Sequence, residues 1–329
     1  MSEMGKGDCL HTTKAKDPTH CIFGKSDTDE TIHMCISEGP HWIVCGQTGS
    51  GKSVAMNFIL NSMMFKSDPG GLVDPAELRL AIIDPKSVEF SVYKGSPYML
   101  CDPVTNMSDA YGLMQYLAWE MDRRYQLLTV AGVREIKSYH QKFKADPELA
   151  KKCGNDYMPY IVCVIDEYND MVMQEKTVEE PIIRLGQKAR ACGISLLIAT
   201  QRPSADVITP LLKANCPARI GLKTADSVNS MIIIDEAGCE ELKGYGDAYI
   251  KTGAGDKYRV QFPFLTDKMI ADTLDAVKER FGTSEPFDYK EVVVKAGLCE
   301  WATEDGEPYG DAVKAEDRHV RKPARRPRW

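Results

Sequence analysis

Short apolar runs alternate with stretches of helical periodicity along most of the chain. Continuous apolar runs, which are typical of strands buried on both faces, cover residues 42–45, 80–83, 160–165, 194–199 and 219–222. Apolar residues at three- and four-residue spacing predict helices over residues 54–65, 108–128, 182–189 and 269–281. Strands that alternate with helices in this way favour an α/β fold, in which helices flank a mainly parallel central sheet.

Other segments carry weaker patterns. Alternating apolar and polar residues over 21–38 predict edge strands before the main sheet, and residues 248–250 and 258–262 predict a hairpin across a glycine-rich turn. The polar stretch 142–157 contains proline and glycine, so we expect a surface excursion there.

The two ends of the chain lack the periodicity of the middle. We expect a flexible N-terminal arm over residues 1–20, one globular domain over 21–285, and a charged irregular tail over 286–329. The tail ends in a basic segment in which prolines separate Arg318, Arg321, Lys322, Arg325, Arg326 and Arg328. A solvated tail is one interpretation of this segment, and an accessory contact with nucleic acid or a partner is the other.

The composition is that of an ordinary soluble protein, with 43% hydrophobic and 27% charged residues in 329. No apolar run is long enough to span a bilayer as a helix, and the polar N-terminus has no signal-peptide stretch. The eleven cysteines are scattered, and Cys45 and Cys163 lie inside apolar runs, which indicates free thiols in a reducing cytoplasm. The net charge of −7 argues against a protein that coats nucleic acid, but it allows DNA binding in a narrow channel.

A glycine-rich turn connects the first of these apolar runs to the helix predicted after it. The turn matches the pattern G-x-x-x-x-G-K-[ST] with Gly46, Gln47, Thr48, Gly49, Ser50, Gly51, Lys52 and Ser53. In such a loop, backbone N–H groups cradle phosphate oxygens, and the helix N-terminus adds a partial positive charge. Lys52 would reach the β- and γ-phosphates, and the Ser53 hydroxyl would ligate Mg²⁺. We therefore expect this octet, with Val54 behind it, to bind ATP and Mg²⁺.

Two carboxylates and an amide come at the ends of later apolar runs. Asp166 and Glu167 follow the run 160–165, and Gln201 comes shortly after the run 194–199. Asp166 would hold Mg²⁺ through water, and Glu167 would orient and deprotonate the attacking water. Because neighbouring parallel strands end at the same edge, we expect Gln201 to hydrogen-bond the γ-phosphate or that water. Without the glycine loop, the simpler interpretation is that the acidic pair starts a helix and that Gln201 starts a polar loop. Because the glycine loop is present, all three residues are catalytic candidates.

A series of longer sequence blocks occurs in order between Gly24 and Phe262. The blocks are Ile-Asp-Pro-Lys (83–86), Met-Asp-Arg-Arg-Tyr (121–125), Ile-Asp-Glu-Tyr (165–168), Gln-Lys-Ala-Arg-Ala-Cys-Gly-Ile (187–194), Ala-Thr-Gln-Arg-Pro-Ser (199–204), Val-Ile-Thr (207–209), Leu-Lys-Ala-Asn (212–215) and Gly-Tyr-Gly-Asp (244–247). Together they resemble the motor domain of the FtsK/SpoIIIE family of DNA translocases. Several of these blocks are specific to that family and are not general features of P-loop proteins.

The resemblance implies a RecA-like P-loop ATPase that assembles as a ring, usually a hexamer, around double-stranded DNA. It implies ATP at subunit interfaces, with Lys52, Ser53, Asp166, Glu167 and Gln201 as the P-loop lysine and hydroxyl, the acidic pair and the sensor. The membrane anchor and linker of the cell-division proteins, most of the domain before the motor, and the winged-helix domain after it have no counterpart in the sequence. We therefore expect a motor without them, of phage or mobile-element type, for genome packaging, transfer or segregation.

One position departs from the family pattern. Met231 stands where the family carries an arginine, a candidate for reaching the γ-phosphate bound by a neighbouring subunit. Arg219 is our replacement candidate for this role in trans, and Arg190 is the next. A structural ion pair is the alternative interpretation of each arginine.

DNA contacts are predicted on the hairpin near the end of the domain. Lys251 and Lys257 flank its glycine-rich turn with Arg259 beside them, and such cations meet phosphates without reading bases. An ordinary solvated turn is the alternative. We expect binding to duplex DNA without strong sequence preference, weakening steeply as salt rises. A secretion- or conjugation-type ATPase that moves protein or nucleoprotein, and a ring that hydrolyses nucleotide only slowly, are the alternative functions.

Overall fold

The computed structural model describes residues 17–65 and 71–298. This part of the chain forms a nine-stranded sheet in the order β2-β1-β9-β8-β7-β3-β6-β5-β4. The strands are β1 (His20–Ser26), β2 (Thr31–Cys35), β3 (His41–Cys45), β4 (Leu78–Ile83), β5 (Tyr160–Ile165), β6 (Ile194–Thr200), β7 (Ala218–Leu222), β8 (Asp247–Lys251) and β9 (Lys257–Gln261). Neighbours from β7 to β4 pair in parallel, and neighbours from β7 to β2 pair antiparallel. The predicted α/β fold with a parallel centre is confirmed, and the antiparallel extension makes the complete sheet mixed.

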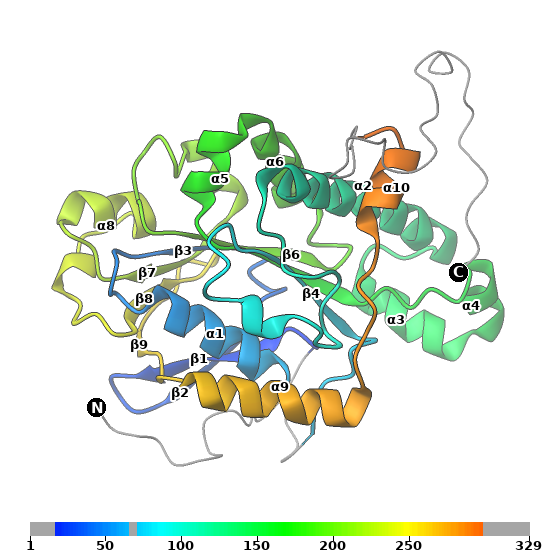
Figure 1. Ribbon diagram of the computed structural model, residues 1–329, viewed down its shortest axis with the longest axis horizontal. Helices are drawn as coiled ribbons and strands as arrows, with labels where there is room; N and C mark the ends of the chain where they lie inside the picture. The colour runs from blue at the N-terminus through cyan, green and yellow to red at the C-terminus, as the bar shows by residue number, and fades with distance from the viewer. Residues whose placement is uncertain (1–16, 66–70, 299–329) are drawn as a thin grey trace.

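Helices cover both faces of the sheet, with α2, α5 and α6 on one side and α1 and α9 on the other (Figure 1). The α-helices are α1 (Lys52–Met63), α2 (Met107–Ala131), α3 (Ile136–Ala145), α4 (Pro147–Lys152), α5 (Tyr168–Gln174), α6 (Glu179–Lys188), α7 (Pro210–Asn215), α8 (Ser227–Ile234), α9 (Asp267–Phe281) and α10 (Tyr289–Lys295). Short 3-10 helices are η1 (Ser91–Tyr93), η2 (Lys176–Val178) and η3 (Cys239–Glu241). The four helices predicted from periodicity correspond to α1, α2, α6 and α9.

The parallel strands bring the sequence motifs to one edge of the sheet. Cys45 of β3 lies opposite Thr200 of β6, and Ile165 of β5 lies opposite Ile198 of β6. Every residue of these three strands is buried, which explains why their sequences are continuously apolar and do not alternate. The glycine loop, the acidic pair and Gln201 therefore leave the sheet at the same edge, as predicted.

Helix α1 is enclosed on two sides because the antiparallel part of the sheet curls beneath it. The hydroxyl of Ser62 on α1 accepts a hydrogen bond from the backbone N–H of Ile22 on β1 at 3.1 Å. Ten of the twelve residues of α1 are buried. Two of its buried amides are linked through one hydroxyl: Asn61 Nδ2 donates to the Tyr93 hydroxyl at 2.8 Å, and that hydroxyl donates to Asn57 Oδ1 at 2.9 Å. The helix after the glycine loop is therefore a core element and has no broad solvent face.

The stretch 142–157 lies at the surface, as predicted, with most of its residues exposed, and it is largely helical. It contains the end of α3 and the whole of α4. The Asp146 side chain caps α4 by accepting two backbone N–H groups of its first turn, each at 3.0 Å. Pro147 occupies the first helical position, where its missing N–H costs no intrahelical hydrogen bond. The surface position is as predicted, and the proline starts a helix there.

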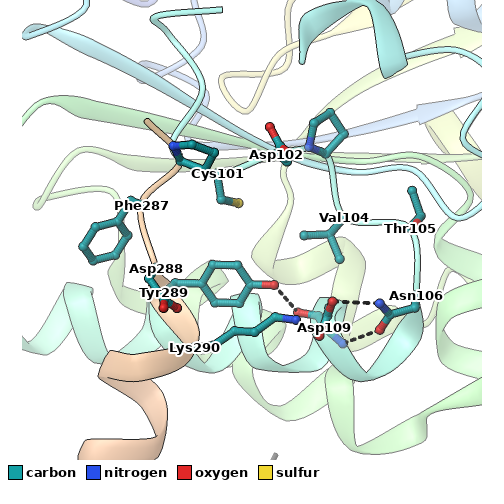
Figure 2. Close-up of a pocket in the computed structure, with 12 residues that line it drawn as sticks. Cys101, Asp102, Val104, Thr105, Asn106, Asp109, Phe287, Asp288, Tyr289 and Lys290 are labelled. Atoms are coloured by element: carbon teal, nitrogen blue, oxygen red, sulfur yellow. Dashed lines mark hydrogen bonds and ion pairs between the residues drawn. The ribbon is translucent and has the colours of Figure 1, made fainter. Parts of the chain in front are cut away.

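The tail predicted to be irregular from residue 286 begins with helix α10, which packs on α2. Figure 2 shows this seam, where Lys290 pairs with Asp109 at 2.6 Å and the Tyr289 hydroxyl donates to the Asp109 carbonyl at 3.2 Å. A pocket of about 440 Å³ lies between this segment and the loop before α2, and no residue of the glycine loop or the acidic pair lines it. The basic segment of the tail and most of the N-terminal arm lie outside the described residues.

Two predictions from composition can be compared with the described ranges. None of the helices placed there combines the length and the apolar character that a bilayer span requires. The nine cysteines in these ranges are free and buried, and Cys45 and Cys163 lie within β3 and β5, as expected.

A buried ion pair within α2 carries a hydrogen bond to the turn before β6. Arg124 is 1% exposed and donates to Glu120 Oε1 at 2.8 Å and to the Cys192 carbonyl at 2.9 Å. Burial alone would raise the pKa of Glu120, but the guanidinium groups of Arg124 and Arg123 outweigh burial and lower that pKa. The pair therefore holds Glu120 ionised inside the protein.

We expect Arg124→Ala to lower the free energy of unfolding by about 3 kcal/mol, because it leaves the buried Glu120 carboxylate with Arg123 alone and the Cys192 carbonyl without its donor. Since the pKa of Glu120 is lower in the folded than in the unfolded chain, its contribution is present above the ordinary carboxyl pKa and is lost as the pH falls through the folded value. Urea unfolding at neutral and acidic pH measures both effects. The control is Arg184→Ala, which removes an exposed pair with Asp122 of α2 and should cost under about 1 kcal/mol. Equal losses for the two variants would contradict the prediction.

Candidate nucleotide-binding site

The glycine loop lies between β3 and α1, as its sequence predicts. β3 ends at Cys45 and α1 begins at Lys52. Gly49 and Gly51 have φ angles of 80° and 95°, a left-handed conformation that favours glycine. A Cβ atom on Gly51 would lie 2.3 Å from the backbone nitrogen of Gly246, so only glycine lets these two backbones meet. The loop thus leads into a buried helix N-terminus, which is a favourable place for an anion.

Lys52 and Asp166 meet directly at this edge of the sheet. Lys52 is 4% exposed, and its Nζ atom forms an ion pair with Asp166 Oδ1. Asp166 is likewise buried, and its backbone N–H donates to the carbonyl of Ile83 at the end of β4 at 2.9 Å. Two opposite charges buried together stabilise each other, whereas either one alone would be costly. The pair joins the cation of the glycine loop to the first carboxylate of the acidic motif.

The residues around this pair suit a magnesium nucleotide. The hydroxyl of Ser50 is buried and has no hydrogen-bond partner among the described residues, so it is available to a phosphate oxygen. Ser53 is half-buried next to Lys52. In the described ranges, no group of three or more His, Cys, Asp or Glu side chains forms a metal site by itself. Mg²⁺ would therefore need phosphate oxygens as well as Ser53 and Asp166, which is how proteins commonly hold this ion.

Glu167, the second carboxylate, is oriented by the end of the neighbouring strand β6. It is 4% exposed and has a φ angle of 61°, which is uncommon for a residue other than glycine and recurs at functional sites. Its Oε1 atom accepts a hydrogen bond from Thr200 Oγ1 at 2.8 Å, and the backbone nitrogen of Gln201 lies 3.2 Å from both carboxylate oxygens. Thr200 was not among the predicted site residues.

Lys86 is a second residue that the motif analysis did not assign to the site. Its Nζ atom lies 3.9 Å from Glu167 Oε2 and 3.9 Å from Asp170 Oδ2. The buried carboxylate of Asp84 fixes the loop that carries it, accepting backbone N–H groups at 3.0 to 3.2 Å from Lys86, Ser87, Glu89 and Phe90. The block Ile-Asp-Pro-Lys was the only sequence signal, and it did not indicate that Lys86 would approach Glu167.

Gln201 contacts the glycine loop directly. Thr48 Oγ1 donates a hydrogen bond to Gln201 Oε1 at 2.8 Å. The two segments border a pocket of about 320 Å³, lined by Gln47, Gln201, Arg202, Pro203, Ser204, Thr224, Ala225 and Asn229. The structure therefore brings the glycine loop, the acidic pair and Gln201 together, while their chemical roles stay predictions.

Arg219, the candidate for a role in trans, lies away from this edge. It is the second residue of β7 and lies opposite Ile43, the middle residue of β3. Its side chain is 9% exposed and forms an ion pair with Asp235. The structural ion pair that we considered as the alternative is thus present, and a role in trans would require Arg219 to leave it. Arg190 and Met231 are both exposed.

The cations predicted to contact DNA have carboxylate partners within the chain. Lys251 lies 3.4 Å and Lys257 lies 2.9 Å from oxygens of Glu236, and Arg259 lies 2.8 Å from Asp247 Oδ2. Hydrogen bonding to Lys257 lowers the pKa of Glu236, and hydrogen bonding to Asp247 raises the pKa of Arg259. The contact between the hairpin and DNA stays a prediction, but these ion pairs offset the positive charge that would attract phosphates.

Fold and site together define a P-loop nucleotide-binding protein with a RecA-like core, in which a glycine loop, an acidic pair and a polar strand end meet at one edge of a parallel sheet. A sequence model described as the FtsK/SpoIIIE family matches residues 10–205. The chain belongs to the FtsK/SpoIIIE family. The predicted resemblance is confirmed.

Curated relatives with the name DNA translocase FtsK match most of the chain. The protein from Vibrio parahaemolyticus is 39% identical over 285 residues, which cover 81% of this chain and 27% of that protein. The protein from Pseudomonas aeruginosa is 42% identical over 262 residues, which cover 74% of this chain and 32% of that protein. The chain therefore spans about a third or less of the length of these relatives.

Solved structures with the same fold come from conjugation and secretion systems. The pCW3 conjugation coupling protein TcpA, in its monomer form with ATPγS, is 27% identical with a TM-score of 0.66, covering 81% of this chain and 72% of that chain. The cytoplasmic domain of the type VII secretion ATPase EccC from Thermomonospora curvata is 20% identical with a TM-score of 0.68, covering 85% and 33%. The similarity to EccC supports the fold of this chain and nothing about its function.

Proposed function

We propose that this chain is the ATPase motor of a double-stranded DNA translocase that works as a homo-hexameric ring. The observation that carries the proposal is the meeting of Lys52, Asp166, Glu167 and Gln201 at one edge of the sheet. The relatives named DNA translocase FtsK support DNA as the substrate. The TcpA neighbour, a conjugation coupling protein, favours a role in DNA transfer by a mobile element. The free buried thiols fit a reducing cytoplasm.

The site residues divide the work of hydrolysis among them. Lys52 neutralises charge on the β- and γ-phosphates, and the N-terminus of α1 binds their oxygens. Glu167 accepts the proton of the attacking water, in an orientation set by Thr200 and the backbone N–H of Gln201. Mg²⁺ bound with the nucleotide, near Ser53 and Asp166, supplies further positive charge to the phosphates. Through its contact with Thr48, Gln201 links the state of the glycine loop to β6.

For the DNA contact, we propose a different group of cations from the hairpin. Arg134, Lys137 and Arg190 are exposed and form no ion pair among the described residues. The backbone N–H of Ile136 donates to the carbonyl of Ala191 at 2.8 Å, which places the start of α3 beside the turn that carries Arg190. Unpaired cations gathered in this way suit phosphate contacts without base recognition. Both this cluster and the hairpin lie towards the amino ends of the parallel strands, opposite the nucleotide edge.

The two candidate DNA surfaces can be separated by paired substitutions. Joint Arg134→Ala and Lys137→Ala substitution should weaken duplex DNA binding and make the slope of log affinity against log salt shallower by about two. Joint Lys251→Ala and Lys257→Ala substitution is the matched control and should change the slope little, because Glu236 already offsets both charges. Fluorescence anisotropy with labelled duplexes over a salt series measures this. If the Lys251 and Lys257 substitutions changed the salt slope more than the Arg134 and Lys137 substitutions, the hairpin would be the DNA-binding surface.

Duplex DNA should raise ATP turnover, and the increase should disappear at high salt as phosphate contacts are lost. Steady-state phosphate release with and without DNA measures this effect. A motor that moves proteins would hydrolyse ATP at a rate that DNA does not change, and this result would favour the secretion-type alternative. No turnover above that of the Glu167→Gln variant would indicate a ring that binds nucleotide without acting as a motor.

A further inference from the structure

An exposed tyrosine in an unusual backbone conformation lies beside the glycine loop. Gly244, Tyr245 and Gly246 are consecutive residues with φ angles of 83°, 55° and 90°. A bulky residue with positive φ is an outlier, and such strain persists only where the surrounding structure imposes it. The Tyr245 side chain is 74% exposed, so burial of its ring does not compensate for the strain.

The backbone around Tyr245 is fixed against the glycine loop. The N–H of Gly246 donates to the Ser50 carbonyl at 2.9 Å, and no atom larger than hydrogen fits between Gly51 and Gly246. On the other side, Gln261 Nε2 donates to the Tyr245 carbonyl at 2.8 Å. The aromatic ring of Tyr245 is therefore exposed, whereas its backbone is held by hydrogen bonds beside the glycine loop.

The order of the strands fixes the direction in which a nucleotide extends from this loop. The groups that would meet the γ-phosphate, Asp166, Glu167 and Gln201, follow β5 and β6, which lie on one side of β3. The loop that carries Tyr245 leads into β8, which lies on the other side of β3, beyond β7. A triphosphate with its γ end towards β6 therefore directs its nucleoside towards β7 and β8.

We propose that Tyr245 is the platform on which the purine base of the nucleotide stacks. This inference rests on the proposed function, because it assigns the base-binding part of the same site. An aromatic ring stacks on any base without reading its edge, and it favours purines because they offer the larger face. The strain at Tyr245 then has a physical reason, since the left-handed conformation holds the ring at the rim of the loop.

The test compares binding of ATP with binding of inorganic tripolyphosphate, which has no base. Tyr245→Gly removes the ring and suits the backbone conformation, so the variant should fold at least as well as the original protein. We expect it to bind ATP about tenfold more weakly and tripolyphosphate with unchanged affinity. Tyr245→Phe and Tyr245→Trp keep a ring and should bind ATP within about twofold of the original protein. Tyr258→Ala, which removes a tyrosine exposed on β9, is the matched control.

The outcomes separate this inference from the proposed function. Isothermal titration of each variant with both ligands gives the affinities, and thermal unfolding checks the fold. If the original protein binds and hydrolyses ATP and Tyr245→Gly binds it equally well, the stacking platform is wrong while the motor stands. Equal weakening of ATP and tripolyphosphate would also overturn the platform, because it would show distortion of the glycine loop. If the original protein binds neither ligand saturably, the proposed function fails, and the platform with it.

Discussion

Lys52→Ala is expected to weaken ATP binding by about a hundredfold or more and to reduce hydrolysis to background. The Lys52 ammonium is buried beside Asp166, in a place where little water can screen its attraction for phosphate. Losing charge-assisted hydrogen bonds to two phosphates removes roughly 3 kcal/mol, which corresponds to about a hundredfold in affinity. Titration with a fluorescent ATP analogue measures the affinity, and phosphate release measures the turnover.

The same substitution should also affect the protein without nucleotide. Removing Lys52 leaves the Asp166 carboxylate buried without its partner, so we expect the free energy of unfolding to fall by up to about 3 kcal/mol. Lys94→Ala, which removes an exposed lysine paired with Asp102, is the matched control and should leave both affinity and stability nearly unchanged. ATP affinity within threefold of the original protein in a folded Lys52→Ala variant would rule out the phosphate role.

Glu167→Gln is expected to keep ATP binding and to lower turnover by about a thousandfold, within the usual range for loss of a general base. The amide oxygen can still accept hydrogen bonds from Thr200 and from the backbone of Gln201, so the local geometry should persist. What the amide cannot do is accept a proton from the attacking water. Single-turnover hydrolysis, with binding measured separately, isolates the chemical step.

The control for this prediction is Asp170→Asn. Asp170 is a second carboxylate 3.9 Å from Lys86, one turn further along the chain, but it is not held by β6. If proximity to Lys86 alone mattered, the two variants would behave alike. We expect Asp170→Asn to change turnover by less than about threefold, and a comparable loss in both variants would argue against Glu167 as the base.

Much of the site could be predicted because its parts are local. The octet that ends at Ser53 needs only a strand before it and a helix after it. The spacing of apolar residues on either side predicts both elements. The acidic pair and Gln201 follow buried parallel strands, and parallel strands end at one edge whatever their order. Their meeting with Lys52 follows from those two facts.

The parts that could not be predicted depend on contacts between distant residues. Lys86 approaches Glu167 only because Asp84 folds the loop after β4 around its carboxylate. The sequence could not name the carboxylates that pair with Arg219 and the hairpin lysines, which the turn after α8 supplies as Asp235 and Glu236. No periodicity marks such pairs, because they form between side chains from different elements after the sheet has assembled.

The enclosure of α1 between the two halves of the curled sheet limits how this subunit can convert chemistry into movement. A helix with ten of its twelve residues buried resists tilting or sliding alone, since close-packed interiors transmit displacement and do not absorb it. A push on the glycine loop must therefore displace the sheet and α1 as one stiff body. In the ring proposed above, a stroke would then be made by whole subunits turning against one another.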